Sequence, residues 1–106
     1  MSRSVVHPLG MVWYDEADYA DARRVMRDGD SLPNAYGDWL ARAVQAEGAV
    51  LALGVPVIRA PIRSGPFLAW CVTHRAEPDR RGRSRYAFDH AHDRFIDELR
   101  GGHPRG

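Results

Sequence analysis

The chain has 106 residues, 44% of them apolar, and its 15 basic and 14 acidic residues give a formal net charge of +1. This length predicts one domain over 1–106, and the apolar fraction excludes a disordered chain. No apolar run approaches the roughly 20 residues of a membrane-spanning helix, and 1–10 lacks the pattern of a signal peptide. We therefore expect a cytoplasmic protein without membrane contact. The single cysteine agrees with this expectation, because one thiol cannot form an internal disulfide.

Charge is distributed unevenly along the chain. All 15 basic residues are arginine, and a genomic composition bias is the favoured explanation. Residues 1–53 contain five arginines and eight acids, for a net −3, whereas residues 54–106 contain ten and six, for a net +4. This difference in charge indicates a polar partner or two oppositely charged faces that meet, although a solvated surface is the commoner cause.

The first half of the chain predicts one strand and two helices. The apolar segment 11–14, MVWY, is bounded by turn-forming residues and predicts a strand. Asp15 is placed to cap a helix that Gly29 ends near residue 28. Apolar residues at helical spacing then predict a second helix within 31–54.

The segment 54–62 predicts a second strand, because it is rich in β-branched residues. Pro56 and Pro61 cannot donate hydrogen bonds within a sheet, so at least one side of this strand is an edge. Two strands alone make a marginal sheet in water, and two copies could complete it by pairing their edges. We therefore predict an α+β domain, in the order β-α-α-β-α-α, with a few-stranded sheet packed by helices and completed by dimerisation.

Two helices are predicted after this strand. Ser64 is placed to cap a short helix over 66–74, which is apolar nearly all round and should be buried. Pro78 suits the first turn of a long final helix. That helix ends at the glycines that open 101–106, a segment that we expect to be flexible, like 1–10.

Five segments follow one another along the chain: WYDEADY, LPNAYGDWL, GVPVIRAPI, FLAWC and RSRYAFDHA. In sequence and spacing they resemble a group of small bacterial proteins of unknown function, of about 100 residues. The resemblance spans residues 12 to 92. It implies a compact bacterial α+β domain, and it brings no activity, cofactor or site residue with it.

The segment 88–95, FDHAHDRF, contains two histidines and two aspartates. On a helix His90 and His92 lie about 160° apart, so they cannot bind one metal ion together, and no metal or other cofactor is predicted. His92 shares its helical face with Phe88 and Phe95 and is expected to point inward, where a backbone carbonyl or a carboxylate satisfies it. A histidine in a pocket or interface is the alternative.

Glu47 lies on the apolar side of the second predicted helix, where a carboxylate is costly unless it is paired or reaches water. We favour a place at the edge of the apolar stripe with the carboxylate in water; if Glu47 is buried, Arg59 or His92 is its natural partner. Arg59 alternates with apolar residues in the second strand, and a solvated face is the commoner explanation for it. The alternative is a ligand-binding or enzymatic pocket around Glu47, Arg59 and His92, with Trp39 and Trp70 as its aromatic side chains.

The segment 74–85 is rich in arginine. Its candidates for contact with the phosphates of a nucleic acid are Arg75, Arg80, Arg81, Arg83 and Arg85. Glu77 and Asp79 interrupt this basic run, and the whole chain is nearly neutral. Nucleic-acid binding is therefore the third and least favoured function.

The sequence has no phosphate-binding glycine loop, dinucleotide fingerprint, zinc-ligand spacing or catalytic pattern. Cys71 lies in an apolar helix and is expected to be a small core residue, not a nucleophile. These observations favour a binding or protein-interaction module, as a homodimer, over an enzyme.

Overall fold

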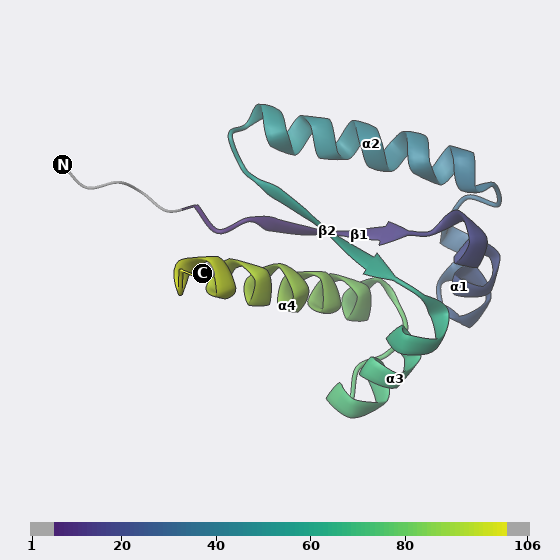
Figure 1. Ribbon diagram of the computed structural model, residues 1–106. Coiled ribbons are helices and arrows are strands. Elements are labelled where there is room, and N and C mark those ends of the chain that lie inside the picture. The colour runs from purple at the N-terminus through teal and green to yellow at the C-terminus, as the bar shows by residue number, and fades with distance from the viewer. Residues whose placement is uncertain (1–5, 102–106) are drawn as a thin grey trace.

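The computed structural model describes residues 6–101; the outer parts of the two predicted flexible segments, 1–5 and 102–106, lie outside the described residues. Figure 1 shows the elements of the described part. In chain order they are β1 (Leu9–Tyr14), α1 (Tyr19–Val25), α2 (Tyr36–Ala52), β2 (Val57–Ile62), α3 (Ser64–His74) and α4 (Arg80–Leu99). Two short 3-10 helices span Glu16–Asp18 and Gly29–Ser31. The predicted α+β class is confirmed, and no helix in 6–101 is long and apolar enough to cross a membrane.

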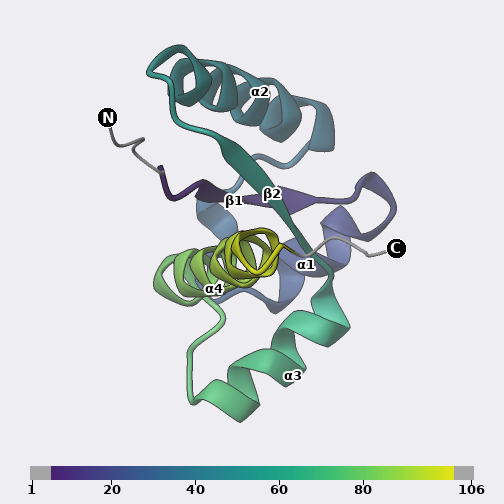
Figure 2. The same ribbon diagram turned by 60° about the vertical axis from the view of Figure 1, so that its left-hand side comes forward.

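The two strands are parallel, with Leu9 opposite Val57 and Tyr14 opposite Ile62. The connection between them contains α1 and α2; α2 covers one face of the sheet, while α4 covers the other (Figures 1 and 2). The Leu9 amide donates to Pro56 O at 2.9 Å. Since backbone groups alternate in direction along a strand, the amides and carbonyls of Gly10 and Val12 point away from β2.

Helix α4 lies close against β1 because small residues meet at the contact. A Cβ atom added to Gly10 would lie 2.0 Å from the Ala87 carbonyl oxygen and 3.0 Å from the Ala91 Cβ. Ala87 and Ala91 are both buried. The helix therefore buries its small side chains, and its larger apolar residues face elsewhere.

The core lies between the carboxyl ends of the strands and helices α1, α2 and α3. Trp39 of α2 packs edge-to-face on Tyr14 at the end of β1, with ring centroids 5.0 Å apart. The buried cluster consists of Tyr14, Tyr19, Ala22, Met26, Trp39, Ile62, Phe67 and Cys71. Cys71 is thus a core residue, as predicted, and burial raises the pKa of its thiol.

Several boundaries differ from the predicted ones. β1 begins at Leu9, two residues before the predicted strand and within the segment 1–10. The Asp15 carboxylate caps only a 3-10 turn by accepting from the Ala17 amide at 3.3 Å, and α1 starts four residues later. Pro78 lies before α4, because Asp79 is the N-cap residue of that helix and accepts from the Gly82 amide at 3.0 Å.

Candidate functional site

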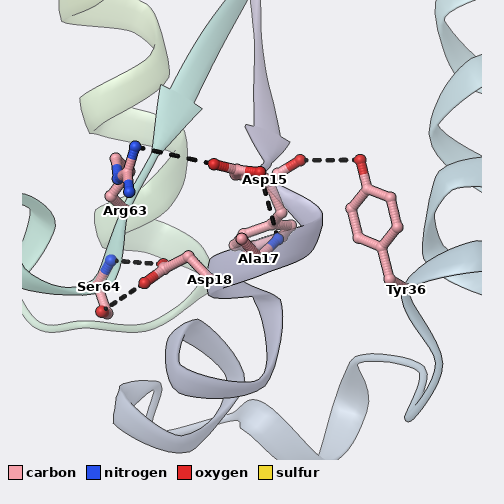
Figure 3. Close-up of polar contacts among 7 residues, drawn as sticks. Asp15, Ala17, Asp18, Tyr36, Arg63 and Ser64 are labelled. Atoms are coloured by element: carbon pink, nitrogen blue, oxygen red, sulfur yellow. Dashed lines mark hydrogen bonds and ion pairs between the residues drawn. The ribbon is translucent and has the colours of Figure 1, made fainter.

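Polar side chains gather at the carboxyl ends of the two parallel strands, the edge at which α/β proteins commonly bind ligands (Figure 3). Asp18 accepts from the Ser64 amide at 2.8 Å and from the Ser64 hydroxyl at 2.9 Å. The Tyr36 hydroxyl donates to Tyr14 O at 3.1 Å. Asp18 therefore serves as the cap of α3, in place of the predicted Ser64 side chain. These groups are bonded to one another, and the edge is closed by internal contacts.

Glu47 and Arg59 come together on the α2 face of the sheet. The Arg59 guanidinium donates to both Glu47 carboxylate oxygens at 2.8 Å and lies 3.8 Å from the centre of the Trp13 ring. The hydrogen bond from Arg59 lowers the pKa of Glu47. Glu47 is half-buried, which fits a place at the edge of the apolar stripe, and its carboxylate is paired with Arg59, one of its two predicted partners. The Arg59 side chain is 51% exposed, so the ion pair between helix and strand lies at the surface.

His92 lies on the other side of the sheet from this pair. It is exposed on α4, so the predicted inward orientation is wrong. The physical reason is the burial of the small Ala87 and Ala91 face, which turns the His92 face outward. His92 Nδ1 lies 3.1 Å from His7 Nε2, and the two rings stack with centroids 5.3 Å apart.

The five predicted ligand residues divide into separate groups. The Trp39 ring packs edge-to-face on Trp13, the ring over which Arg59 lies, so Trp39 adjoins the pair of Arg59 and Glu47. Trp70 stacks on His74 of α3 with ring centroids 4.4 Å apart, and His92 lies on α4. Within residues 6–101 no group of three or more histidine, cysteine or acidic side chains could hold a metal ion.

The five arginines predicted to contact phosphate differ in their burial and in their partners. Arg83 is buried, and its guanidinium donates to the two Asp28 carboxylate oxygens at 2.6 and 3.0 Å. Arg83 therefore cannot reach a nucleic acid, and this candidate is corrected. Arg85 donates to His74 O at 3.2 Å, and its guanidinium lies 5.6 Å from the centre of the Trp70 ring. The remaining candidates, Arg75, Arg80 and Arg81, are exposed.

Sequence reasoning missed a groove of about 440 Å³ between β1 and the first half of α4. We call it the β1 groove; its lining comprises His7, Pro8, Leu9, Gly10, Val12, Val55, Ser84, Ala87 and Phe88. The small residues Gly10, Ala87 and Ala91 could have indicated a close contact between strand and helix. They could not have indicated which side of that contact stays open.

Large side chains of α4, three of them apolar and one a histidine, continue from this groove along the helix. We call them the α4 stripe: Phe88, His92, Phe95 and Leu99. Phe88 is 55% exposed and Leu99 57% exposed. His7 lies over the stripe, with its ring 5.3 Å from that of Phe88 and 4.7 Å from that of Phe95. The β1 groove and the α4 stripe form one candidate interaction surface.

Comparisons with known proteins identify no relative for this arrangement. No family model, no curated protein and no solved structure matches the chain.

Proposed function

We propose that this protein is an interaction module that forms a homodimer by pairing the β1 strands of two copies. The observation that carries the proposal is that an open strand edge and an exposed apolar stripe adjoin one another. Gly10 and Val12 of β1 line the β1 groove together with Phe88 of α4. A partner that covers one of these features therefore also covers the other.

The free part of the β1 edge is short and has defined ends. Pro8 has no amide hydrogen, and the carbonyl of Tyr14 accepts from the Tyr36 hydroxyl. The outward groups between them belong to Gly10 and Val12. If the two-fold axis passes beside Met11, Gly10 faces Val12 of the partner subunit in an antiparallel pair, and each such pair exchanges two hydrogen bonds.

The same pairing places the two copies of α4 at a suitable distance. Helix α4 contacts both strands on one face of the sheet, and β1 more extensively than β2. Neighbouring strands are about 4.8 Å apart, so the two copies of α4 would be separated by at most about two strand spacings, about 10 Å. Packed helices are typically 8–10 Å apart. The α4 stripes of the two subunits would meet across the axis.

Apolar burial supplies the driving force for this association. Phe88 and Leu99 are more than half exposed in the single chain. Full burial of one such side chain is worth about 1.5–3 kcal/mol, so half of that is available from each, and symmetry doubles the number of residues. A contiguous apolar surface on a small protein is typical of an interaction site.

Sedimentation velocity over about 1–100 µM tests the proposal, a range that covers ordinary homodimer affinities. We expect a dimer for the wild-type chain and a monomer for Phe88→Glu and for Leu99→Glu. Leu53→Glu is the matched control, because Leu53 is an apolar residue that is 80% exposed near the end of α2. A monomeric wild-type chain at the highest concentration would refute the dimer.

Hydrogen exchange locates the interface independently of the stripe. The Gly10 and Val12 amides should exchange slowly in the wild-type dimer and rapidly in Phe88→Glu. A dimer whose Gly10 and Val12 amides exchange as fast as those of the monomeric variant would contradict pairing through β1.

The other predicted functions gain less from the geometry. A pocket around Glu47, Arg59 and His92 would require His92 to lie on the α2 face of the sheet, whereas it lies on α4 at the other face. The Arg59 guanidinium also already donates to Glu47. The cytoplasmic location and the resemblance to small bacterial proteins stay predictions.

A further inference from the structure

A second hollow lies where α3 turns into α4, far along the chain from β1. Figure 2 shows the short link between these helices. The hollow has a volume of about 410 Å³, and we call it the elbow pocket. Its lining comprises Arg75, Ala76, Glu77, Asp79, Arg81, Gly82 and Arg85. Three of these seven residues are arginines and two are acidic.

The three arginines reach the elbow pocket from different positions. Arg75 follows the last residue of α3, Arg81 lies in the first turn of α4, and Arg85 lies one turn further along that helix. Arg85 is held in place, because it donates to His74 O and lies over the Trp70 ring. Arginines from the end of α3 and the beginning of α4 thus line the same hollow.

Arg75 has an unusual backbone conformation. Its φ of 54° and ψ of 41° place it in the left-handed region, and no other non-glycine residue in 6–101 has a positive φ. Glycine is the usual residue at this position after a helix, because a Cβ atom is disfavoured there. The fold therefore has an arginine at the rim of the pocket where glycine would be more stable.

The acidic side chains at the pocket are already engaged. Glu77 accepts from Arg27 at 2.5 Å, and Asp79 accepts from the Gly82 amide. In the described part of the chain, Arg75, Arg81 and Arg85 form no ion pair. The three guanidinium groups are therefore free to bind an anion, whereas the amino-terminal end of α4 is already capped by the Asp79 carboxylate.

We propose that the elbow pocket binds the phosphate group of a small phosphorylated molecule. Guanidinium groups match the oxygen atoms of phosphate, and each can donate two parallel hydrogen bonds. One compact surface hollow suits a single phosphate group better than a nucleic-acid backbone, which requires a row of cations along its path. Arg83, the residue that would have extended such a row, is buried. This site does not depend on the β1 groove or on dimerisation.

Titration of the wild-type chain with inorganic phosphate and with pyrophosphate, at constant ionic strength, tests the proposal. Backbone amide resonances report the binding site, and Trp70 fluorescence reports contact with Arg85. We expect saturable shifts at Arg81 and Gly82, and none when chloride replaces phosphate. Equal shifts with chloride, or no saturation, would overturn it.

Two variants localise the binding. Arg81→Gln should weaken phosphate binding about tenfold, since one charge-assisted hydrogen bond is lost. Arg42→Gln, a change to an exposed arginine of α2, is the control and should bind as the wild type does. Equal affinities of these two variants would refute the site.

Arg75→Gly separates binding from folding. It should raise the unfolding temperature, because glycine adopts the left-handed conformation readily, and at the same time weaken phosphate binding. A variant that is more stable and binds phosphate unchanged would exclude Arg75 from the site. Tighter binding of a single-stranded oligonucleotide than of pyrophosphate, with a steep salt dependence, would overturn the small-molecule assignment in favour of a nucleic acid.

Discussion

Replacement of Arg83 by methionine tests how much a single ion pair contributes to this fold. Arg83 projects from the first turn of α4 and is 8% exposed. It donates to both carboxylate oxygens of Asp28, which lies 55 residues earlier in the chain, after α1. The pair thus fastens the beginning of α4 to the segment that follows α1. Methionine has a similar volume and keeps the site filled while removing every donor.

The expected loss in the free energy of unfolding depends on the Asp28 carboxylate, which the substitution leaves without its partner. Removal of one partner from a buried ion pair costs about 3–5 kcal/mol, because the other charge remains without compensation. The Asp28 side chain is 29% exposed and can recover part of its hydration, so we expect the lower end, about 3 kcal/mol. Arg27→Met is the control, because Arg27 and Glu77 form a largely exposed pair, worth about 0–1 kcal/mol.

The cost should also depend on pH. The hydrogen bond from Arg83 lowers the pKa of Asp28 below that of an ordinary carboxyl group. A carboxyl whose pKa is lower in the folded state stabilises the protein above its unfolded pKa, about 3.9, and this contribution is lost as the pH falls through the folded pKa. The deficit of Arg83→Met should therefore be largest near pH 7. It should shrink at pH 3, where the unpaired Asp28 of the variant is protonated.

Urea denaturation at pH 7 and pH 3, at one fixed protein concentration, measures both effects. Fixed concentration matters because dimerisation would add to the apparent stability. Asp28→Asn in the Arg83→Met background should restore part of the loss at pH 7. The reasoning would be refuted if Arg83→Met cost no more than Arg27→Met, or if its deficit were the same at both pH values.

Two further substitutions test the packing around β1. Gly10→Ala would place a Cβ atom 2.0 Å from the Ala87 carbonyl oxygen, so α4 must move away from the sheet, and we expect a loss of about 1–3 kcal/mol on thermal unfolding. Gly48→Ala, at a helical position with open space around it, should instead gain up to about 1 kcal/mol. Tyr14→Phe should leave stability unchanged or raise it by about 1 kcal/mol in urea denaturation, because the buried Tyr14 hydroxyl has no hydrogen-bond partner in the described residues and burial raises its pKa to about 12. A clear loss in Tyr14→Phe would mean that the hydroxyl is bonded.

Local signals in the sequence were sufficient for the elements themselves. The apolar run at 11–14 lies within β1, and the β-branched run at 54–62 contains β2. Gly54 and Gly101 both have positive φ just beyond the ends of long helices, as glycine at such positions indicates. Caps were harder to place, because several acidic residues lie close together and each can bond to a different amide. Asp15 and Asp18 illustrate this, since the second caps α3 and not the helix that follows it.

Contacts between distant segments could be predicted only where the geometry leaves few choices. Glu47 and Arg59 are 12 residues apart on a helix and the strand that follows it, and their pairing was among the alternatives from the sequence. Arg83 and Asp28 belong to elements whose relative placement depends on the whole fold. Nothing in the basic run at 74–85 distinguishes the buried arginine from its exposed neighbours.

The orientation of α4 shows why the candidate surface was missed. Hydrophobicity alone ranks the face with Phe88, His92 and Phe95 above the face with Ala87, and on that basis His92 was expected to point inward. In the structure the close approach to Gly10 admits only small side chains, so alanines are buried while His92 and Phe88 are exposed. A single folded chain gains nothing from an exposed phenylalanine, whereas two chains that met through β1 and α4 would bury it. The same packing that overturns the prediction for His92 thus supports the proposed dimer through the helix as well as the strand.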